Sequence, residues 1–231
     1  MIGLRSGDAI VVHASLRAVG LDADAVIEVL LEAVGTDGLV VMPTFTYDNG
    51  TYSPDLPART GTLADVFRRR PDALRSGHPT YSVAAVGAGA AELLDGHERA
   101  GATGVDSPLG RLAAAGGYVL LLGVGQSANT TVHVGEFVAG APYLDIPFDP
   151  AWPVHGAHTF PGCSRAFGVL ERPLRERGAI RDGTVGRAPA QLVRGEEVIE
   201  ATVELLREDP PGLLCTDPGC YRCSRARARL G

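Results

Sequence analysis

The sequence lacks the features that would place it in a membrane or on nucleic acid. No window offers the roughly 20 consecutive apolar residues that a transmembrane helix needs, and residues 1–5 do not lead into the apolar run of a signal peptide. The formal net charge is −6, whereas binding to phosphate backbones requires clustered Lys and Arg. We therefore expect a cytoplasmic protein that binds neither membranes nor nucleic acids.

Internal repeats, low-complexity segments and a convincing linker are absent as well. What is present is an ordinary globular composition, with 45% hydrophobic and 21% charged residues. A chain of 231 residues can bury a core of useful size within one large domain. We expect a single domain over 1–231 that ends in an irregular tail at about 209–231, and the sequence leaves a homodimer open.

Short apolar runs alternate with amphipathic segments along the chain, which is typical of an α/β fold. A helix between the first two apolar runs makes a βαβ unit, so these two strands should be parallel. We expect a central, largely parallel sheet flanked by helices. Strands are predicted at 8–12, 39–42, 83–86, 118–122 and 167–170, helices at 22–34, 62–70, 88–94, 108–115, 172–178 and 196–208, and a turn at 181–185.

One stretch, YVLLLGVGQSANTTVHVGE at 118–136, combines a buried strand, a glycine turn and the start of a helix. Open α/β sheets bind ligands at the point where such strands end. His133 and Glu136 are three residues apart and would share one face of the helix. Because an imidazole beside a carboxylate can act as a general base, this pair is the leading catalytic candidate.

Two further patterns point to other classes of protein. Gly123 and Gly125 suggest a dinucleotide-binding loop, but the rest of the glycine fingerprint is missing, which makes an oxidoreductase a weak reading. Cys220 and Cys223 form a CxxC, and Cys215 and Cys163 bring the thiols to four. Four thiols can bind zinc tetrahedrally, although the spacing is not that of two matched CxxC pairs. The residues alone leave a non-catalytic metal- or small-molecule-binding module open.

Several segments together resemble the aminoglycoside 3-N-acetyltransferase family, which has the antibiotic N-acetyltransferase fold. They occur in consistent order over about residues 3–145, and two segments near the C-terminus add to the likeness. The segments are VVHASLRAVG at 11–20, GLVVMPTFTYD at 38–48, RSGHPTYSVAAVG at 75–87, SPLGRL at 107–112, VLLLGVG at 119–125, NTTVHVGE at 129–136, GCSRAF at 162–167 and LLCTDPGCYRC at 213–223.

The resemblance implies an acetyl-CoA-dependent N-acetyltransferase whose acceptor is typically the 3-amino group of a 2-deoxystreptamine aminoglycoside, an activity that gives antibiotic resistance. It maps the catalytic histidine onto His133, and it lets Glu136 orient the imidazole or hold ammonium groups of the substrate. The amine would attack the thioester directly, and backbone N–H groups at 123–127 are candidates for stabilising the oxyanion. The alternative is an acyltransferase of the same fold that acts on another amine, such as a biosynthetic intermediate.

The resemblance also implies contacts with the two substrates. Cofactor contacts are expected at Ser15, Leu16, Arg17, Ser76, Ser82 and Ser107, and contacts with the amine at Asp48, Thr131 and Glu136. Ser107 is equally well explained as a plain helix cap. Since the family has a similar tail without a general need for metal, the resemblance favours free or packed thiols over zinc at Cys215, Cys220 and Cys223.

The other histidines have more ordinary readings. A structural hydrogen bond and a role in the site are equally good explanations of His13, which ends a predicted strand. His78 precedes a proline and is expected to form a turn or line the site. His155 and His158 lie in a stretch rich in Pro and Gly and are expected at the surface.

Overall fold

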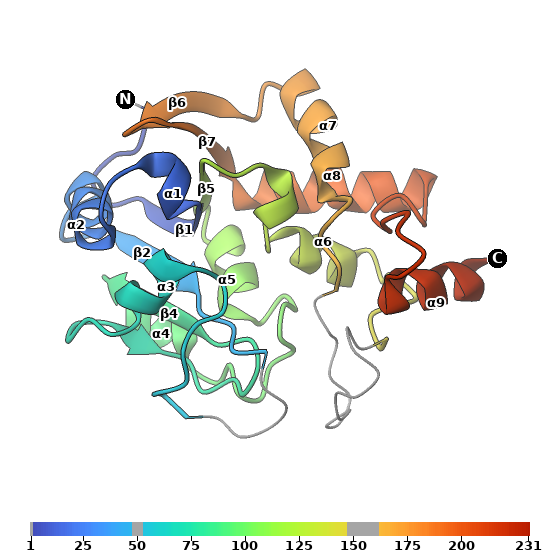
Figure 1. The fold of residues 1–231 in the computed structure, drawn as a ribbon, viewed down its shortest axis with the longest axis horizontal. Coiled ribbons are helices and arrows are strands. Elements are labelled where there is room, and N and C mark those ends of the chain that lie inside the picture. Colours follow the sequence, from blue (N-terminus) through green and yellow to red (C-terminus); the bar gives the residue numbers. More distant parts are fainter. Residues whose placement is uncertain (1, 48–52, 147–161) are drawn as a thin grey trace.

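The computed structural model describes residues 2–47, 53–146 and 162–231, which form one seven-stranded sheet with helices packed against it (Figure 1). The strand order across the sheet is β3-β4-β2-β1-β5-β7-β6. The strands are β1 (Ala9–Ala14), β2 (Leu39–Pro43), β3 (Leu74–Arg75), β4 (Val83–Gly87), β5 (Tyr118–Leu122), β6 (Arg181–Val185) and β7 (Ala188–Arg194).

The sheet is mixed. β1 lies between β2 and β5 and is parallel to both, and the four outer pairings, β2–β4, β4–β3, β5–β7 and β7–β6, are antiparallel. The predicted α/β fold with a helix-flanked sheet is confirmed, but the parallel part is confined to the three central strands. A two-residue connection joins β6 to β7, and such a connection can only join antiparallel strands.

Helices cover both faces of the sheet, and alternate residues of each central strand enter two separate hydrophobic clusters. In β1, Val11 packs with residues of α5, α6 and α8, whereas Ile10 and Val12 pack with residues of α2 and α3. This alternation is the period of two that a strand imposes. The helices are α1 (Leu16–Val19), α2 (Ala23–Val34), α3 (Thr62–Phe67), α4 (Ala90–Leu94), α5 (Pro108–Ala114), α6 (Val132–Val138), α7 (Glu171–Glu176), α8 (Gly195–Glu208) and α9 (Tyr221–Leu230), with 3₁₀ turns η1 (Gln126–Ala128) and η2 (Phe167–Leu170).

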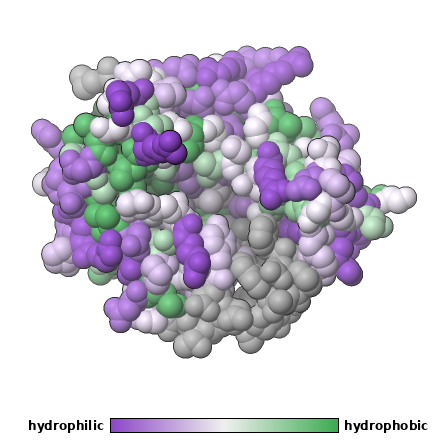
Figure 2. Space-filling model, in the orientation of Figure 1, coloured by the Kyte–Doolittle hydropathy of each residue, from purple (hydrophilic) through white to green (hydrophobic). Residues whose placement is uncertain are grey.

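Three predictions for the C-terminal third are wrong. Residues 167–170 form η2 rather than a strand, residues 181–185 form strand β6 rather than a turn, and the tail expected to be irregular contains helix α9. The tail is helical because Arg and Ala, which are strong helix formers, dominate 222–229. β6 is an edge strand with exposed Arg181 and Asp182, and a hydrophilic band runs over this part of the molecule (Figure 2). Charged side chains on an edge strand discourage pairing with another chain.

Among the helices that the structure describes, not one combines the length and the apolar character of a transmembrane span. The helix predicted at 62–70 ends earlier, at Phe67. Gly61 occupies the N-cap position, and Asp65 accepts hydrogen bonds from the backbone of Ala58 and from Arg68.

Candidate active site

A cavity of about 710 Å³ opens at the edge of the sheet where β1, β2 and β5 end. The three parallel strands share this edge, so the segments that follow them converge on the same space. The described lining residues are Val12, His13, Ala14, Met42, Pro43, Phe45, Tyr47, Arg59, Thr60, Gly61, Leu63, Ala64, Tyr81, Val124, Ala128, Asn129, Thr130, His133, Gly162, Cys163, Ser164 and Arg165. This cavity is the candidate site for binding and chemistry.

His133 and Glu136 form a buried pair in α6, at the wall of the cavity. Nδ1 of His133 lies 2.6 Å from Oε2 of Glu136, and the two residues are 4% and 1% exposed. Because an ionised carboxylate can only accept hydrogen bonds, Nδ1 of His133 carries the ring proton and donates the hydrogen bond to Glu136. Nε2 is then left with a lone pair, and His133 presents its ring to the cavity. Phe167 packs edge-on against the same ring, with centroids 4.8 Å apart.

A chain of hydrogen bonds holds the polar loop that leads into α6. Nδ2 of Asn129 donates to Oε1 of Gln126 at 2.9 Å, and Nε2 of Gln126 donates to Oε1 of Gln191 on β7 at 3.2 Å. Oδ1 of Asn129 accepts from the backbone N–H of Thr131 at 3.0 Å. Gln126, Asn129 and Thr131 are buried, and satisfied buried polar networks are rigid. The network therefore fixes the start of α6 and with it the position of His133.

Gly123 provides the turn between β5 and this loop. Its φ of +64° is in the left-handed region, and an added Cβ would lie 2.6 Å from Cβ of Ala18 and 3.2 Å from Cβ of Ala188. Only glycine meets both requirements without strain. The Gly123 N–H donates to the carbonyl of Pro189 and is therefore not available to an oxyanion. Of the backbone N–H groups expected at 123–127 to stabilise the oxyanion, those of 124–127 remain candidates.

His13 belongs to the site rather than to the interior alone. Its Nε2 lies 3.3 Å from Oγ1 of Thr130, and both residues line the cavity. Burial lowers the pKa of His13 to about 4, so the ring is neutral at neutral pH. Of the two readings that the sequence left open, the structure favours a place in the site.

Ser15, Leu16 and Arg17, expected to contact the cofactor, lie just beyond β1 but do not line the described cavity. Ser15 is the N-cap of α1, where its Oγ accepts from the Ala18 N–H at 3.4 Å. Leu16 and Arg17 form the first turn of that helix, and Arg17 is exposed.

The other three serines expected to contact the cofactor are buried and already hydrogen-bonded within the protein. Oγ of Ser76 lies 2.8 Å from Nδ1 of His97, and Oγ of Ser82 donates to the carbonyl of Thr44 at 2.9 Å. Ser107 caps α5, where its Oγ accepts from the Gly110 N–H at 3.2 Å. Their hydroxyl groups stabilise the fold, which favours the plain-cap reading of Ser107.

The remaining predicted positions fall into three groups. Thr131 is 1% exposed, and within the described residues its hydroxyl has no hydrogen-bond partner. His78 forms a turn, as expected, because its Nδ1 accepts from the N–H groups of Thr80 and Tyr81. Asp48, together with the two histidines predicted at the surface, lies outside the described residues.

Several residues that line the cavity were not predicted as site residues from the sequence. Arg59 and Arg165 line the cavity from segments outside the motif at 118–136, and the guanidinium group of Arg165 pairs with Asp217. Tyr47 and Tyr81 also line the cavity. Tyr47, Tyr81 and Arg165 lie in segments that carry the family resemblance, at 38–48, 75–87 and 162–167, and this was the available hint for them, whereas Arg59 lies outside these segments. Among the described lining residues there is no carboxylate.

The four cysteines, which the sequence spreads over 61 positions from 163 to 223, come together beside this cavity. Cys163 lies in the cavity wall and meets Cys215, Cys220 and Cys223, so the four thiols weighed as zinc ligands from the sequence lie together in the structure.

Comparison with known proteins identifies the family. A family profile described as aminoglycoside 3-N-acetyltransferase matches residues 11–207. The chain belongs to the aminoglycoside 3-N-acetyltransferase family. It is similar to aminoglycoside N(3)-acetyltransferase IV of Salmonella sp, with 31% identity over 98% of this chain and 91% of the relative. It is also similar to aminoglycoside N(3)-acetyltransferase VII of Streptomyces paromomycinus, with 32% identity over 90% of this chain and 88% of the relative.

Solved structures of the family share the fold. The apoenzyme of aminoglycoside acetyltransferase AAC(3)-IVa matches with a TM-score of 0.84 and 30% identity, over 98% of this chain and 92% of that one. A histidine-to-alanine variant of AAC(3)-IVa, in complex with gentamicin, matches with a TM-score of 0.86 and the same identity and coverage. AAC-IIIb in a binary complex with CoASH matches with a TM-score of 0.76 and 26% identity, over 90% of this chain and 92% of that one. The predicted family, fold and class of enzyme, an acetyltransferase, are confirmed.

Proposed function

We propose that this protein transfers an acetyl group from acetyl-CoA to the 3-amino group of a 2-deoxystreptamine aminoglycoside, with His133 as the general base. The observation that carries the proposal is the 2.6 Å contact between His133 and Glu136 at the wall of the cavity. Family membership supports the reaction class. Relatives solved with CoASH and with gentamicin support the two substrates.

The reaction begins with the loss of a proton from the acceptor ammonium, because a protonated amine has no lone pair with which to attack. Nε2 of His133 takes this proton, and the imidazolium that forms is stabilised by Glu136 through Nδ1. The amine nitrogen then bonds to the thioester carbonyl carbon, and the C–S bond breaks as the carbonyl re-forms. The departing thiolate takes the proton from Nε2 of His133 and leaves as a thiol. The amide nitrogen loses the second proton of the former ammonium to solvent, so one proton is released per turnover and the protein ends in its starting state.

The negative charge that develops on the thioester oxygen needs N–H donors directed at it. With the Gly123 N–H in use, the backbone at 124–127 supplies these donors in our proposal, since Val124 already lines the cavity. The phosphates of coenzyme A need cations, and Arg59 and Arg165 both line the cavity. Arg165 is paired with Asp217, so a phosphate would share or replace that partner. Ser15, Leu16 and Arg17 remain proposed contacts for the outer part of the cofactor.

Two roles were open for Glu136, and its burial favours one of them. Glu136 is 1% exposed and is not among the described residues that line the cavity, whereas His133 is, so Glu136 is poorly placed to receive an ammonium group of the substrate. We therefore assign it to orienting the imidazole and stabilising its charge. Thr131 and Asp48 stay proposed contacts for the amine.

The test is a thiol-release assay with purified protein, acetyl-CoA, a panel of aminoglycosides and a panel of unrelated amines. We expect turnover with aminoglycosides, acetylation at the 3-amino group by NMR, and a loss of about 10²- to 10⁴-fold in kcat for His133→Ala. Calorimetry should show that this variant still binds coenzyme A, because the imidazole acts on the amine. Turnover of other amines alone would support the same-fold alternative, and unchanged turnover by His133→Ala would remove His133 from the mechanism.

A further inference from the structure

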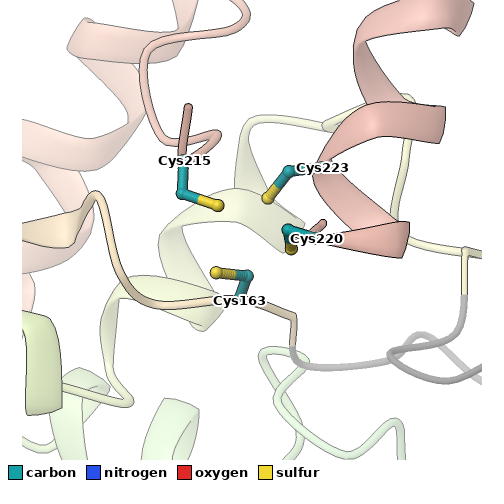
Figure 3. A group of neighbouring side chains, drawn as sticks. All are labelled: Cys163, Cys215, Cys220 and Cys223. Carbon is teal, nitrogen blue, oxygen red and sulfur yellow. The ribbon is translucent and has the colours of Figure 1, made fainter. Parts of the chain in front are cut away.

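Four thiols converge between the substrate cavity and the C-terminal helix (Figure 3). Cys163 comes from the segment before η2, Cys215 from the segment after α8, and Cys220 and Cys223 from the start of α9. In Figure 3 the four side chains approach from different sides and direct their sulfur atoms toward one central space. All four sulfur atoms lie within 4.8 Å of one another.

We propose that these four cysteines hold one zinc ion. A tetrahedral zinc ion with Zn–S bonds of about 2.3 Å places its sulfur ligands about 3.8 Å apart, and the observed cluster fits this size. Disulfide bonds would join the thiols in pairs, but all four are free in the structure. Four sulfur ligands in this arrangement select zinc or iron among the biological metals, and carboxylate-binding cations such as magnesium are excluded.

The surroundings suit the charge of such a centre. Four thiolates and one Zn²⁺ carry a net charge of −2, which requires nearby donors. The backbone N–H groups of Arg165 and Asp217, each two residues beyond a cysteine, donate to Cys163 and Cys215 respectively. Arg227 binds the carbonyl of Cys215 at 2.6 Å and brings a guanidinium group to the same segment.

The proposed ion fills all four positions with protein ligands, so it has no open position for a substrate and its role is structural. Cys163 and its neighbours Gly162, Ser164 and Arg165 form part of the cavity wall. The remaining ligands belong to the C-terminal segment, which lies far from this wall in sequence. The zinc ion would therefore fasten one wall of the cavity to α9.

Metal analysis of the full-length protein tests the proposal directly. After expression with zinc and iron both supplied, elemental analysis should find one zinc per chain, and cobalt substitution should give the charge-transfer absorption of a tetrahedral cobalt thiolate. Cys163→Ser and Cys223→Ser should lose most of the metal. Ser224→Ala is the matched control, since Ser224 adjoins Cys223 and its hydroxyl donates to the Pro218 carbonyl at 3.3 Å. The substitution leaves the backbone bond from Ser224 to Cys220 in place, and this variant should keep the full zinc content.

Variants that fail to fold would not leave the question open, because the thiols of the wild-type protein report on the same site. In the zinc-bound state they should resist a thiol reagent, and all four should react after chelation, with a fall in melting temperature. A folded protein with four reactive thiols and no zinc, two disulfides by mass spectrometry, or stoichiometric iron would overturn the proposal. Zinc content and acetyl transfer are independent readouts, so a zinc-loaded protein without turnover would refute the proposed function alone.

Discussion

Replacing Glu136 with glutamine separates the charge of the His133–Glu136 pair from its shape. The glutamine side chain has nearly the same volume, and its Oε1 can still accept from Nδ1 of His133. What the substitution removes is the negative charge that faces the imidazolium formed when the acceptor amine loses its proton. Because both residues are buried, solvent screens this interaction little.

The size of the effect follows from the kind of hydrogen bond lost. Hydrogen bonds to charged groups contribute about 1.5–3 kcal/mol, whereas neutral ones contribute about 1 kcal/mol. The difference is about 0.5–2 kcal/mol, and about 1.4 kcal/mol corresponds to a factor of ten in rate, so Glu136→Gln should lower kcat by about 2- to 30-fold. Glu136 does not line the cavity, so KM for the aminoglycoside should stay close to that of the wild type.

The assay is steady-state thiol release by four proteins: wild type, Glu136→Gln, His133→Ala and the double variant. If Glu136 acts only through His133, the double variant should be no slower than His133→Ala, because the carboxylate has no imidazole left to support. Glu200→Gln, at an exposed position of α8, is the matched control and should leave kcat unchanged. An unchanged kcat for Glu136→Gln, or an equal loss with and without His133, would refute this reasoning.

Two further predictions concern stability. Burial lowers the pKa of His97 to about 4 in the folded protein, against about 6.5 in the unfolded chain, so the unfolded state binds more protons and stability falls as the pH drops below 6.5. Between about pH 7.5 and pH 5 the free energy of unfolding should fall by about 2 kcal/mol because of His97. Urea titrations at several pH values should show that His97→Gln reduces this fall by about the same amount. An unchanged dependence of the unfolding free energy on pH in the variant would contradict the prediction. Gly123→Ala should cost about 2–5 kcal/mol in urea unfolding, through its left-handed φ and its clash with Ala18. Gly168→Ala, where an added Cβ meets no atom within 4 Å, should cost less than about 1 kcal/mol, and equal losses at the two glycines would exclude the steric explanation.

The sequence predicted what depends on neighbours along the chain. His133 and Glu136 are three residues apart, so one helical turn brings them together, and the apolar run of β5 was visible without its partners. β6 was missed because an edge strand carries polar residues and owes its conformation to pairing with β7. β7 itself includes Pro189, which obscures the strand pattern.

The cavity and the cysteine cluster depend on contacts that no local pattern records. Arg59 enters the cavity wall from the segment before α3, and Arg165 from the segment before η2. Cys163 contacts three cysteines from which it is separated along the chain by α7, β6, β7 and α8. Only the folded chain brings such residues together, which is why the spacing of the four cysteines could not show that Cys163 lies beside Cys215, Cys220 and Cys223.

The bond from Gln126 to Gln191 has a consequence for how the protein is made. At a synthesis rate of about 5–20 residues per second, His133 is synthesised several seconds before β7, whose residue Gln191 holds the loop that precedes α6. A nascent chain that stops short of β7 has the base but not the support that aims it. If His133 is the base, as proposed, we expect a chain terminated before β7 to lack acetyl transfer.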